Sequence, residues 1–130
     1  MIVVDTSALV AVLHREPEGA AFLGHMLSNE TSVGAPTKFE VLLVSARLKR
    51  PGGEIDALEL LQRIGPKILD WTSDHAHMAL DAELRYGKGR HPAKLNFGDC
   101  MAYAVAKSLD APLLFKGHDF AQTDVRRVTG

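Results

Sequence analysis

Four acidic residues of this chain could together hold a metal ion and support phosphodiester chemistry. Carboxylates that converge without matched lysine or arginine repel one another, and a divalent cation relieves that repulsion. Such an ion in an open cleft can align a phosphodiester, polarise its phosphoryl oxygen and lower the pKa of a water for in-line attack. The predicted chemistry is therefore hydrolysis without a covalent nucleophile. The four residues are Asp5, Glu40, Asp99 and Asp119.

Hard oxygen ligands favour Mg²⁺ at such a site, with Mn²⁺ as a substitute. A structural zinc site is not indicated, because the only cysteine is Cys100 and the closest histidines, His75 and His77, stand on different helix faces. Both histidines are predicted to lie at the surface. Cys100 is expected to be a buried, inert thiol.

Helix capping is the alternative explanation for two of the acids. Residues 37–40 (Thr-Lys-Phe-Glu) match a capping box, and residues 96–99 (Asn-Phe-Gly-Asp) resemble one with Asp in place of Glu. Taken singly, Glu40 and Asp99 could therefore be caps only, because a carboxylate at a helix N-terminus interacts favourably with the helix dipole. Asp5 ends a strand, where an acid without a basic partner is costly unless solvent or a cation meets it.

Two hydroxyl side chains, Thr6 and Ser7, follow Asp5 directly. Capping of the next helix is the predicted role of both. The alternative is an accessory role at the metal site, by contact with phosphate or with water on the metal.

Short apolar runs alternate with longer helical patterns along the chain. Short strands that alternate with longer helices indicate a parallel sheet covered on both faces, and thus an α/β fold. Ligands bind such sheets beyond the carboxyl ends of the strands, where all four acids are expected to meet. The predicted strands are 2–4, 31–35, 67–71 and 112–115, with a short one near 127–128, and the predicted helices are 8–14, 18–28, 37–49, 54–64, 73–86 and 97–109.

Composition indicates one globular domain over residues 1–130, because 46% of the residues are hydrophobic and 24% are charged. The net charge of −1 excludes a uniformly basic coat for nucleic acid. The single cysteine cannot form an intrachain disulfide, which favours a reducing cytoplasm. No apolar run approaches the ~20 residues needed to span a bilayer, and the N-terminus does not resemble a signal peptide, so a membrane location is not expected.

One segment, residues 85–94, is strongly basic. It carries +4 and the rest of the chain −5, which sum to the net charge of −1. Because this segment shortly precedes Asp99, we expect it to bind phosphate groups of the substrate beside the acidic site. The alternative is a solvated loop without a binding role. The candidate phosphate-binding residues in it are Lys88, Arg90, His91 and Lys94.

Taken in order, these residues resemble the motifs of the PIN-domain ribonuclease toxins of the VapC family, the toxins of bacterial VapBC type II toxin–antitoxin pairs. The resemblance covers nearly the whole chain. Asp-Thr-Ser alone would be a weak signal, whereas the ordered set is specific. The matching segments are residues 2–9 (Ile-Val-Val-Asp-Thr-Ser-Ala-Leu), Glu40, residues 87–91 (Gly-Lys-Gly-Arg-His), residues 95–100 (Leu-Asn-Phe-Gly-Asp-Cys) and residues 113–120 (Leu-Leu-Phe-Lys-Gly-His-Asp-Phe).

The resemblance implies a PIN-like three-layer α/β/α fold with a short central parallel sheet. It also implies an endoribonuclease that depends on Mg²⁺ or Mn²⁺, an RNA substrate, a VapB-like antitoxin as partner and a homodimer. The catalytic and metal-binding roles of the family fall on the four acids. One departure is His118, where the family usually has Asn before the last acid. Asp124 belongs to a Thr-Asp pair that often follows in the family, and capping is predicted for it rather than a role at the site.

An antitoxin is expected to lay a peptide over an apolar helical surface and to deliver an arginine to the acids. A guanidinium can relieve their repulsion through bidentate hydrogen bonds. The candidates for the anchoring surface are Leu9, Leu13, Phe22 and Met26, with core packing as the alternative.

Two other functions stay open at this point. An aspartate phosphoacceptor or magnesium phosphatase would form a covalent aspartyl phosphate at Asp5. A noncatalytic module would bind RNA or a partner and would have no need of a divalent ion.

Overall fold

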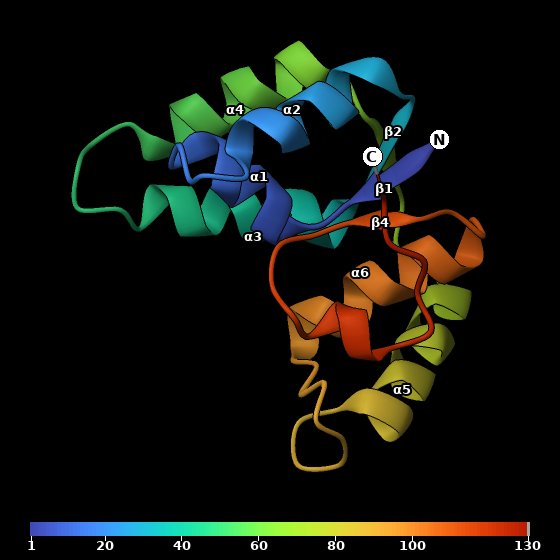
Figure 1. Ribbon diagram of the computed structural model, residues 1–130. Helices are drawn as coiled ribbons and strands as arrows, with labels where there is room; N and C mark the ends of the chain where they lie inside the picture. The colour runs from blue at the N-terminus through green and yellow to red at the C-terminus, as the bar shows by residue number, and fades with distance from the viewer. Residues whose placement is uncertain (130) are drawn as a thin grey trace.

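The computed structural model describes residues 1–129, in which a four-stranded parallel sheet lies between two groups of helices (Figure 1). In chain order the elements are β1 (Ile2–Val4), α1 (Thr6–Leu13), α2 (Gly19–Ser28), β2 (Thr31–Gly34), α3 (Ala35–Ala46), α4 (Gly53–Ile64), β3 (Lys67–Leu69), α5 (Ser73–Tyr86), α6 (Phe97–Ser108), β4 (Leu113–Leu114) and the 3₁₀ turn η1 (Phe120–Gln122). The strands stand in the order β3-β2-β1-β4. Helices α1–α4 gather on one side of the sheet and α5 and α6 on the other. The predicted three-layer α/β/α fold is confirmed.

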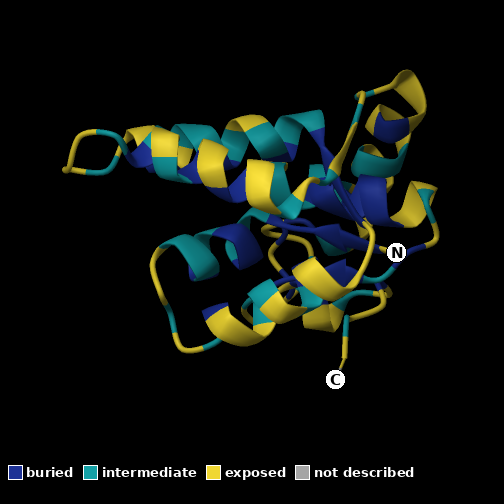
Figure 2. Cartoon of the chain, turned by 90° about the horizontal axis from the view of Figure 1, so that it is seen from above, coloured by how far each residue is buried: buried dark blue, intermediate teal, exposed yellow. Residues whose placement is uncertain are grey.

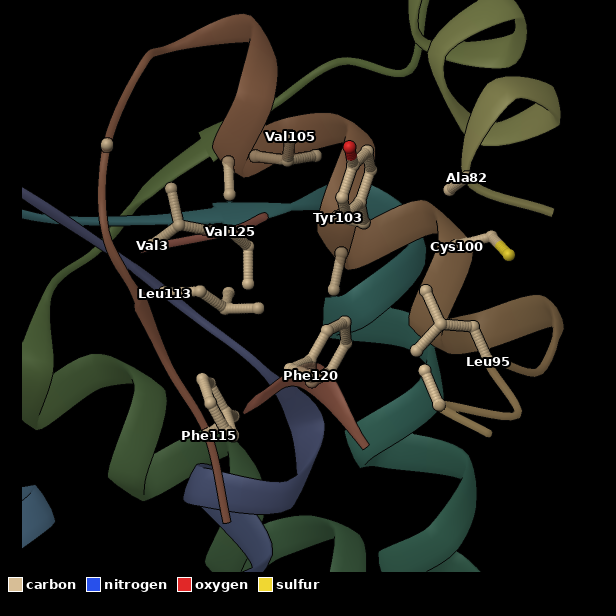
Figure 3. Close-up of a cluster of buried hydrophobic side chains, with 14 residues drawn as sticks. Val3, Ala82, Leu95, Cys100, Tyr103, Val105, Leu113, Phe115, Phe120 and Val125 are labelled. Atoms are coloured by element: carbon tan, nitrogen blue, oxygen red, sulfur yellow. The ribbon is translucent and has the colours of Figure 1, made fainter. Parts of the chain in front are cut away.

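The central strands are buried on both faces and divide the core into two clusters. Val3 and Leu113 point into the cluster under α5 and α6, where Tyr103 packs with them (Figure 3). Ile2 and Val4, the neighbours of Val3, belong to the other cluster, which α1–α4 form against the sheet. This division follows from the alternation of side chains along a strand. Figure 2 shows the result, with buried strands at the centre and exposed residues on the outer faces of the helices.

Helix α3 begins earlier than the sequence pattern predicts. It starts at Ala35 with Gly34 as its N-cap, because Pro36 fits the start of a helix, where its missing N–H costs nothing. Thr37 is buried in the first turn and caps nothing. The capping box predicted for residues 37–40 is therefore wrong, and Glu40 lies in the second turn of α3.

The other predicted elements are found within about three residues of their expected ends. The strand expected near residues 127–128 is reduced to a single bridge between Leu113 and Arg127. Within residues 1–129, no helix is both long enough and apolar enough to cross a membrane.

The apolar surface expected to receive an antitoxin peptide belongs mostly to the core. Leu9 and Met26 are each 1% exposed, in the cluster that α1–α4 form against the sheet. Leu13 and Phe22 are partly buried against the same cluster. Of the two alternatives for Leu9 and Met26, core packing is therefore the one that holds, because side chains in the core cannot contact a partner.

One of the two histidines predicted at the surface is buried. The His75 ring accepts the Thr72 N–H at 3.1 Å and lies 3.2 Å from Ser108 Oγ, so it joins the start of α5 to the end of α6. His77 is exposed, as predicted. Cys100 is buried, as predicted, and burial raises the pKa of its thiol to about 11.

Candidate active site

Asp5 stands at the carboxyl end of β1 and is the N-cap of α1. Its backbone N–H donates to the Leu114 carbonyl at 3.0 Å, which continues the pairing of β1 with β4. Its carboxylate Oδ2 accepts hydrogen bonds from the Ser7 backbone N–H at 3.0 Å and from the Ser7 hydroxyl at 2.6 Å. Only 4% of Asp5 is exposed. The carboxylate is thus held in one orientation at the edge of the sheet.

The hydroxyls of Thr6 and Ser7 donate to acids, and the capping role predicted for them is wrong. Ser7 Oγ donates to Asp5 and accepts the Lys116 backbone N–H at 3.0 Å, so the segment after β4 helps to orient Asp5. Thr6 Oγ1 donates to Glu40 Oε1 at 2.5 Å. These two adjacent side chains therefore connect the start of α1 with two of the four acids.

Glu40 reaches the site from the second turn of α3. The first turn of α3 holds no acidic residue, and the hydrogen bond to the Glu40 carboxylate comes from Thr6. The carboxylate also lies against the first turn of α6, because a Cβ added to Gly98 would stand 2.3 Å from Glu40 Oε2. Helix capping is thus excluded as the role of Glu40.

Asp99 lies in the first turn of α6, where it forms the predicted capping box with the N-cap residue Asn96. Asn96 Oδ1 accepts the Asp99 N–H at 2.8 Å, and Asp99 Oδ2 accepts the Asn96 N–H at 3.1 Å. Burial raises the pKa of Asp99, the Asn96 N–H opposes that rise, and the charges of Asp119 and Glu40 add to it. Asp99 therefore caps a helix and belongs to the acid cluster at the same time.

Asp119 is the outermost of the four acids. It is exposed at the start of η1, and its side chain makes no capping hydrogen bond. Its interaction with Asp99 is electrostatic. His118 is exposed as well, and among residues 1–129 its side chain has no hydrogen bond or ion pair with any of the four acids.

Burial raises the pKa of acids in the cluster, and no basic side chain in the described part of the chain is paired with them. Burial raises the pKa of Asp5 to about 6, the hydrogen bonds from Ser7 oppose the shift, and the charges of Asp99 and Glu40 add to it. No ion pair joins any of the four acids to a basic side chain within residues 1–129. The negative charge of the cluster is thus not balanced by the side chains that the structure describes.

The donor set suits a hard divalent cation, because carboxylate oxygens predominate in it. As positioned, no three His, Cys, Asp or Glu side chains of residues 1–129 come close enough together to hold one ion. Mg²⁺ keeps several waters and is usually bound through one or two carboxylates. The chemistry of these donors therefore fits a hard divalent ion.

Asp124 belongs to a separate network outside the acid cluster, and the capping role predicted for it is wrong. Its carboxylate accepts the Tyr103 hydroxyl at 2.7 Å and the Lys107 ammonium at 3.0 Å, with Arg85 at 3.6 Å. These contacts tie the segment after η1 to α5 and α6.

The basic segment of residues 85–94, called the basic loop from here on, leads from the end of α5 toward the first turn of α6. Lys88, Arg90 and Lys94 are exposed on it, and Arg90 lies 3.7 Å from a glutamate of α5. His91 is half-buried with its ring edge on Tyr86, at 5.1 Å between ring centres. His91 thus supports the loop, a role that the sequence did not predict.

Two residues at the site were missed by reasoning from the sequence. Gly98 makes room for the Glu40 carboxylate, and its place inside the capping box of residues 96–99 was the only local signal. Lys116 orients Ser7 through its backbone N–H, while its ammonium pairs with two glutamates of the α1–α2 turn. A backbone donor leaves no mark in the sequence.

Known proteins match both this fold and this sequence. A family model described as the PIN domain matches residues 2–126. Ribonuclease VapC36 of Mycobacterium tuberculosis is 42% identical over 126 residues, which cover 95% of this chain and 91% of the relative. The crystal structure of M. tuberculosis VapC20, a sarcin-ricin loop cleaving toxin, has a TM-score of 0.78 over 100% of both chains at 16% identity. A toxin-antitoxin complex from Klebsiella pneumoniae has a TM-score of 0.72 at 17% identity, over 95% of this chain and 93% of that one. The solved structures support the fold, and the family model and the sequence identity show that the chain belongs to the VapC ribonucleases of the PIN-domain family.

Proposed function

We propose that this protein is a divalent-metal-dependent endoribonuclease and the toxin of a VapBC-type pair. One observation carries the proposal: acids from four separate segments interact beyond the strand ends, Asp5 is buried among them, and no basic side chain of residues 1–129 is paired with them. An unpaired buried carboxylate costs stability, and such perturbed groups cluster at functional sites. The 42% identity to a VapC ribonuclease supports RNA as the substrate.

We assign the metal ion to Asp5 and Asp99, with Glu40 and Asp119 completing the acid cluster. Asp5 and Asp99 each accept their hydrogen bonds from within the fold at Oδ2, so Oδ1 of each is available for a ligand. Oxygen donors favour Mg²⁺, with Mn²⁺ as a substitute. When bound, the ion would polarise the phosphodiester and make the attacking water more acidic.

The protein's own residues fix the orientation of these acids and hold the RNA. The Ser7 hydroxyl donates to Asp5 and the Thr6 hydroxyl donates to Glu40, so two acids have hydrogen-bond partners within the fold before any substrate arrives. The exposed cations of the basic loop, which leads toward the first turn of α6, are the candidates for binding phosphates on either side of the cleaved bond.

The basic loop can be tested through the salt dependence of RNA binding. We expect Lys88→Ala with Arg90→Ala to weaken binding and to lower the slope of log affinity against log salt by ~0.7 for each lost phosphate contact. The matched control is Arg63→Ala with Lys67→Ala, which removes the same charge near the junction of α4 and β3. Equal slopes for the two double variants would show that the loop does not bind phosphate.

Exposed apolar side chains mark surfaces that protein partners would cover. Ile55 and Leu58 on α4, and Leu80 and Leu84 on α5, are each about half exposed. We propose a VapB-like antitoxin and a second copy of this chain as the partners. The Klebsiella toxin-antitoxin complex, which shares this fold, supports the first of them.

Cleavage of RNA by the purified protein tests the proposal. We expect internal cuts in the presence of Mg²⁺ or Mn²⁺, loss of cleavage in excess chelator, and recovery when the ion is restored. Addition of the product of a neighbouring antitoxin gene should suppress the cuts. Cleavage that persists in chelator would contradict the metal dependence, and a trapped aspartyl phosphate without RNA cleavage would favour a phosphoacceptor.

A further inference from the structure

We propose that Thr6 and Gly98 are positioning residues that together hold the Glu40 carboxylate beside Asp5 and Asp99. This inference rests on the proposed function, since it explains how one acid of the cluster is kept in place. The two residues come from the first turns of α1 and α6, whereas Glu40 comes from α3.

The Glu40 carboxylate is contacted from two sides. On one side the Thr6 hydroxyl donates to Oε1 at 2.5 Å. On the other, the Gly98 Cα faces the carboxylate so closely that an added Cβ would stand 2.3 Å from Oε2, 3.0 Å from Cδ and 3.1 Å from Oε1. Contacts on both sides define one position for a side chain that would otherwise turn freely.

Glu40 needs such support more than Asp5 and Asp99 do. Asp5 and Asp99 are short side chains that also accept backbone N–H groups, which fix their orientation. Among residues 1–129, the Thr6 hydroxyl is the one hydrogen-bond donor to the Glu40 carboxylate. Ordering a long glutamate side chain costs conformational entropy, so neighbours that hold the Glu40 carboxylate in place reduce the cost of bringing it to the site.

Local structure does not explain the glycine at position 98. Gly98 lies in the first turn of α6 without a left-handed backbone, so alanine can adopt the same conformation. Alanine is also a better helix former than glycine. The atoms that an added methyl group would meet form the flexible end of the Glu40 side chain. Gly98→Ala should therefore displace the carboxylate while leaving the fold intact.

The first test compares Gly98→Ala with Gly24→Ala. Gly24 also lies within a helix, and an added Cβ there would meet nothing within 4 Å. We expect Gly98→Ala to lower Mn²⁺ affinity, measured without RNA, by about 10- to 100-fold, and to reduce cleavage while the melting temperature is kept or raised. Gly24→Ala should leave Mn²⁺ affinity unchanged.

A double-variant cycle separates positioning from a general effect on the fold. In a Glu40→Gln background, Gly98→Ala should add little to the loss of Mn²⁺ affinity, because both changes act through the same carboxylate. Additive losses would overturn the inference for Gly98.

The second test replaces the Thr6 hydroxyl. Thr6→Val keeps the shape of the side chain and removes the donor, whereas Thr6→Ser keeps the donor. We expect Thr6→Val to lower Mn²⁺ affinity and cleavage and Thr6→Ser to retain most of both. If Val and Ser behave alike, the hydroxyl does not position Glu40.

A readout without metal or RNA distinguishes failure of this inference from failure of the proposed function. The ¹³C resonance of the Glu40 carboxyl group, recorded without a divalent ion, should shift in Thr6→Val and Gly98→Ala and stay unchanged in Gly24→Ala. An unshifted resonance in both site variants would overturn the positioning role. A wild-type protein that neither cleaves RNA nor binds Mn²⁺ would instead overturn the proposed function, whatever the resonance shows.

Discussion

Asp5→Asn is expected to abolish RNA cleavage and, at the same time, to stabilise the metal-free protein. Loss of the charge removes a metal ligand at nearly constant shape, and a transition-state loss of about 4 kcal/mol corresponds to about 1000-fold in rate. The asparagine oxygen can still accept the Ser7 N–H and so cap α1. A cleavage assay with the divalent ion present measures the first effect, and chemical denaturation in chelator measures the second, both at pH 7.5.

The stabilising effect follows from the pKa of Asp5, which burial raises to about 6 from the ordinary 3.8. The folded state binds the proton more tightly than the unfolded chain does, so the free energy of unfolding falls as the pH rises from about 4 to about 6. Above that window the ionised Asp5 costs up to about 3 kcal/mol, at 1.36 kcal/mol for each pKa unit. Asp5→Asn should remove both this cost and this pH dependence.

Asp70→Asn is a suitable control, because Asp70 is exposed after β3 and has no ion pair within residues 1–129. It should leave cleavage unchanged and give no comparable gain in stability. A less stable Asp5→Asn protein in chelator would show that Asp5 is not held there at a cost. Normal cleavage by that variant would exclude Asp5 from the metal site.

Asp99→Asn should reduce cleavage by a similar factor, whereas Asp124→Asn should leave it within about twofold of the wild type. Both changes remove one negative charge at α6, Asp99 lying within the helix and Asp124 contacting it from outside. Asp99 interacts with Glu40 and Asp119, while Asp124 contacts Tyr103 and Lys107 in the other network. A difference in cleavage between the two variants would therefore result from where the lost carboxylate lies and not from the change in net charge.

The melting temperature of both variants should also be measured, because neither change is expected to unfold the protein. The asparagine at position 99 can still accept the Asn96 N–H, so the α6 cap should persist. Asp124→Asn weakens a partly exposed ion pair with Lys107, which is worth under about 1 kcal/mol. Equal loss of cleavage in both variants, at unchanged melting temperature, would place Asp124 in the catalytic machinery and contradict the assignment made from the structure.

Of the two capping boxes that the sequence predicts, one is present and the other is not. The capping box of residues 96–99 was predicted and is present, because its hydrogen bonds join residues three apart. The same reasoning failed for residues 37–40, where Pro36 moved the helix start and left Glu40 in the second turn. A capping pattern shows that a helix can begin at a position, and a stronger signal nearby can override it.

Packing decided what the periodic patterns left open. Leu9 and Met26 have the same apolar character as the exposed Leu80 and Leu84, and only the arrangement of α1–α4 against the sheet buries the first pair. His75 became a buried link between α5 and α6 because Thr72 and Ser108 are there to bond it. The sequence of a single helix does not show which neighbouring element will pack against it.

The sequence by itself determined the alternation of strands and helices, the α/β class, and the identity of the acids that parallel strands would bring to one edge. These depend on side-chain period, local capping and the common direction of parallel strands, all of which can be read along the chain. Only the tertiary structure decided that the Thr6 and Ser7 hydroxyls serve two different acids, that Gly98 makes room for Glu40, and that Asp124 stands apart from the cluster. The contact between Ser7 and Asp5 is local. Each of the others joins segments that meet only when the helices have packed against the sheet and against one another. The free energy of that packing depends on the whole core.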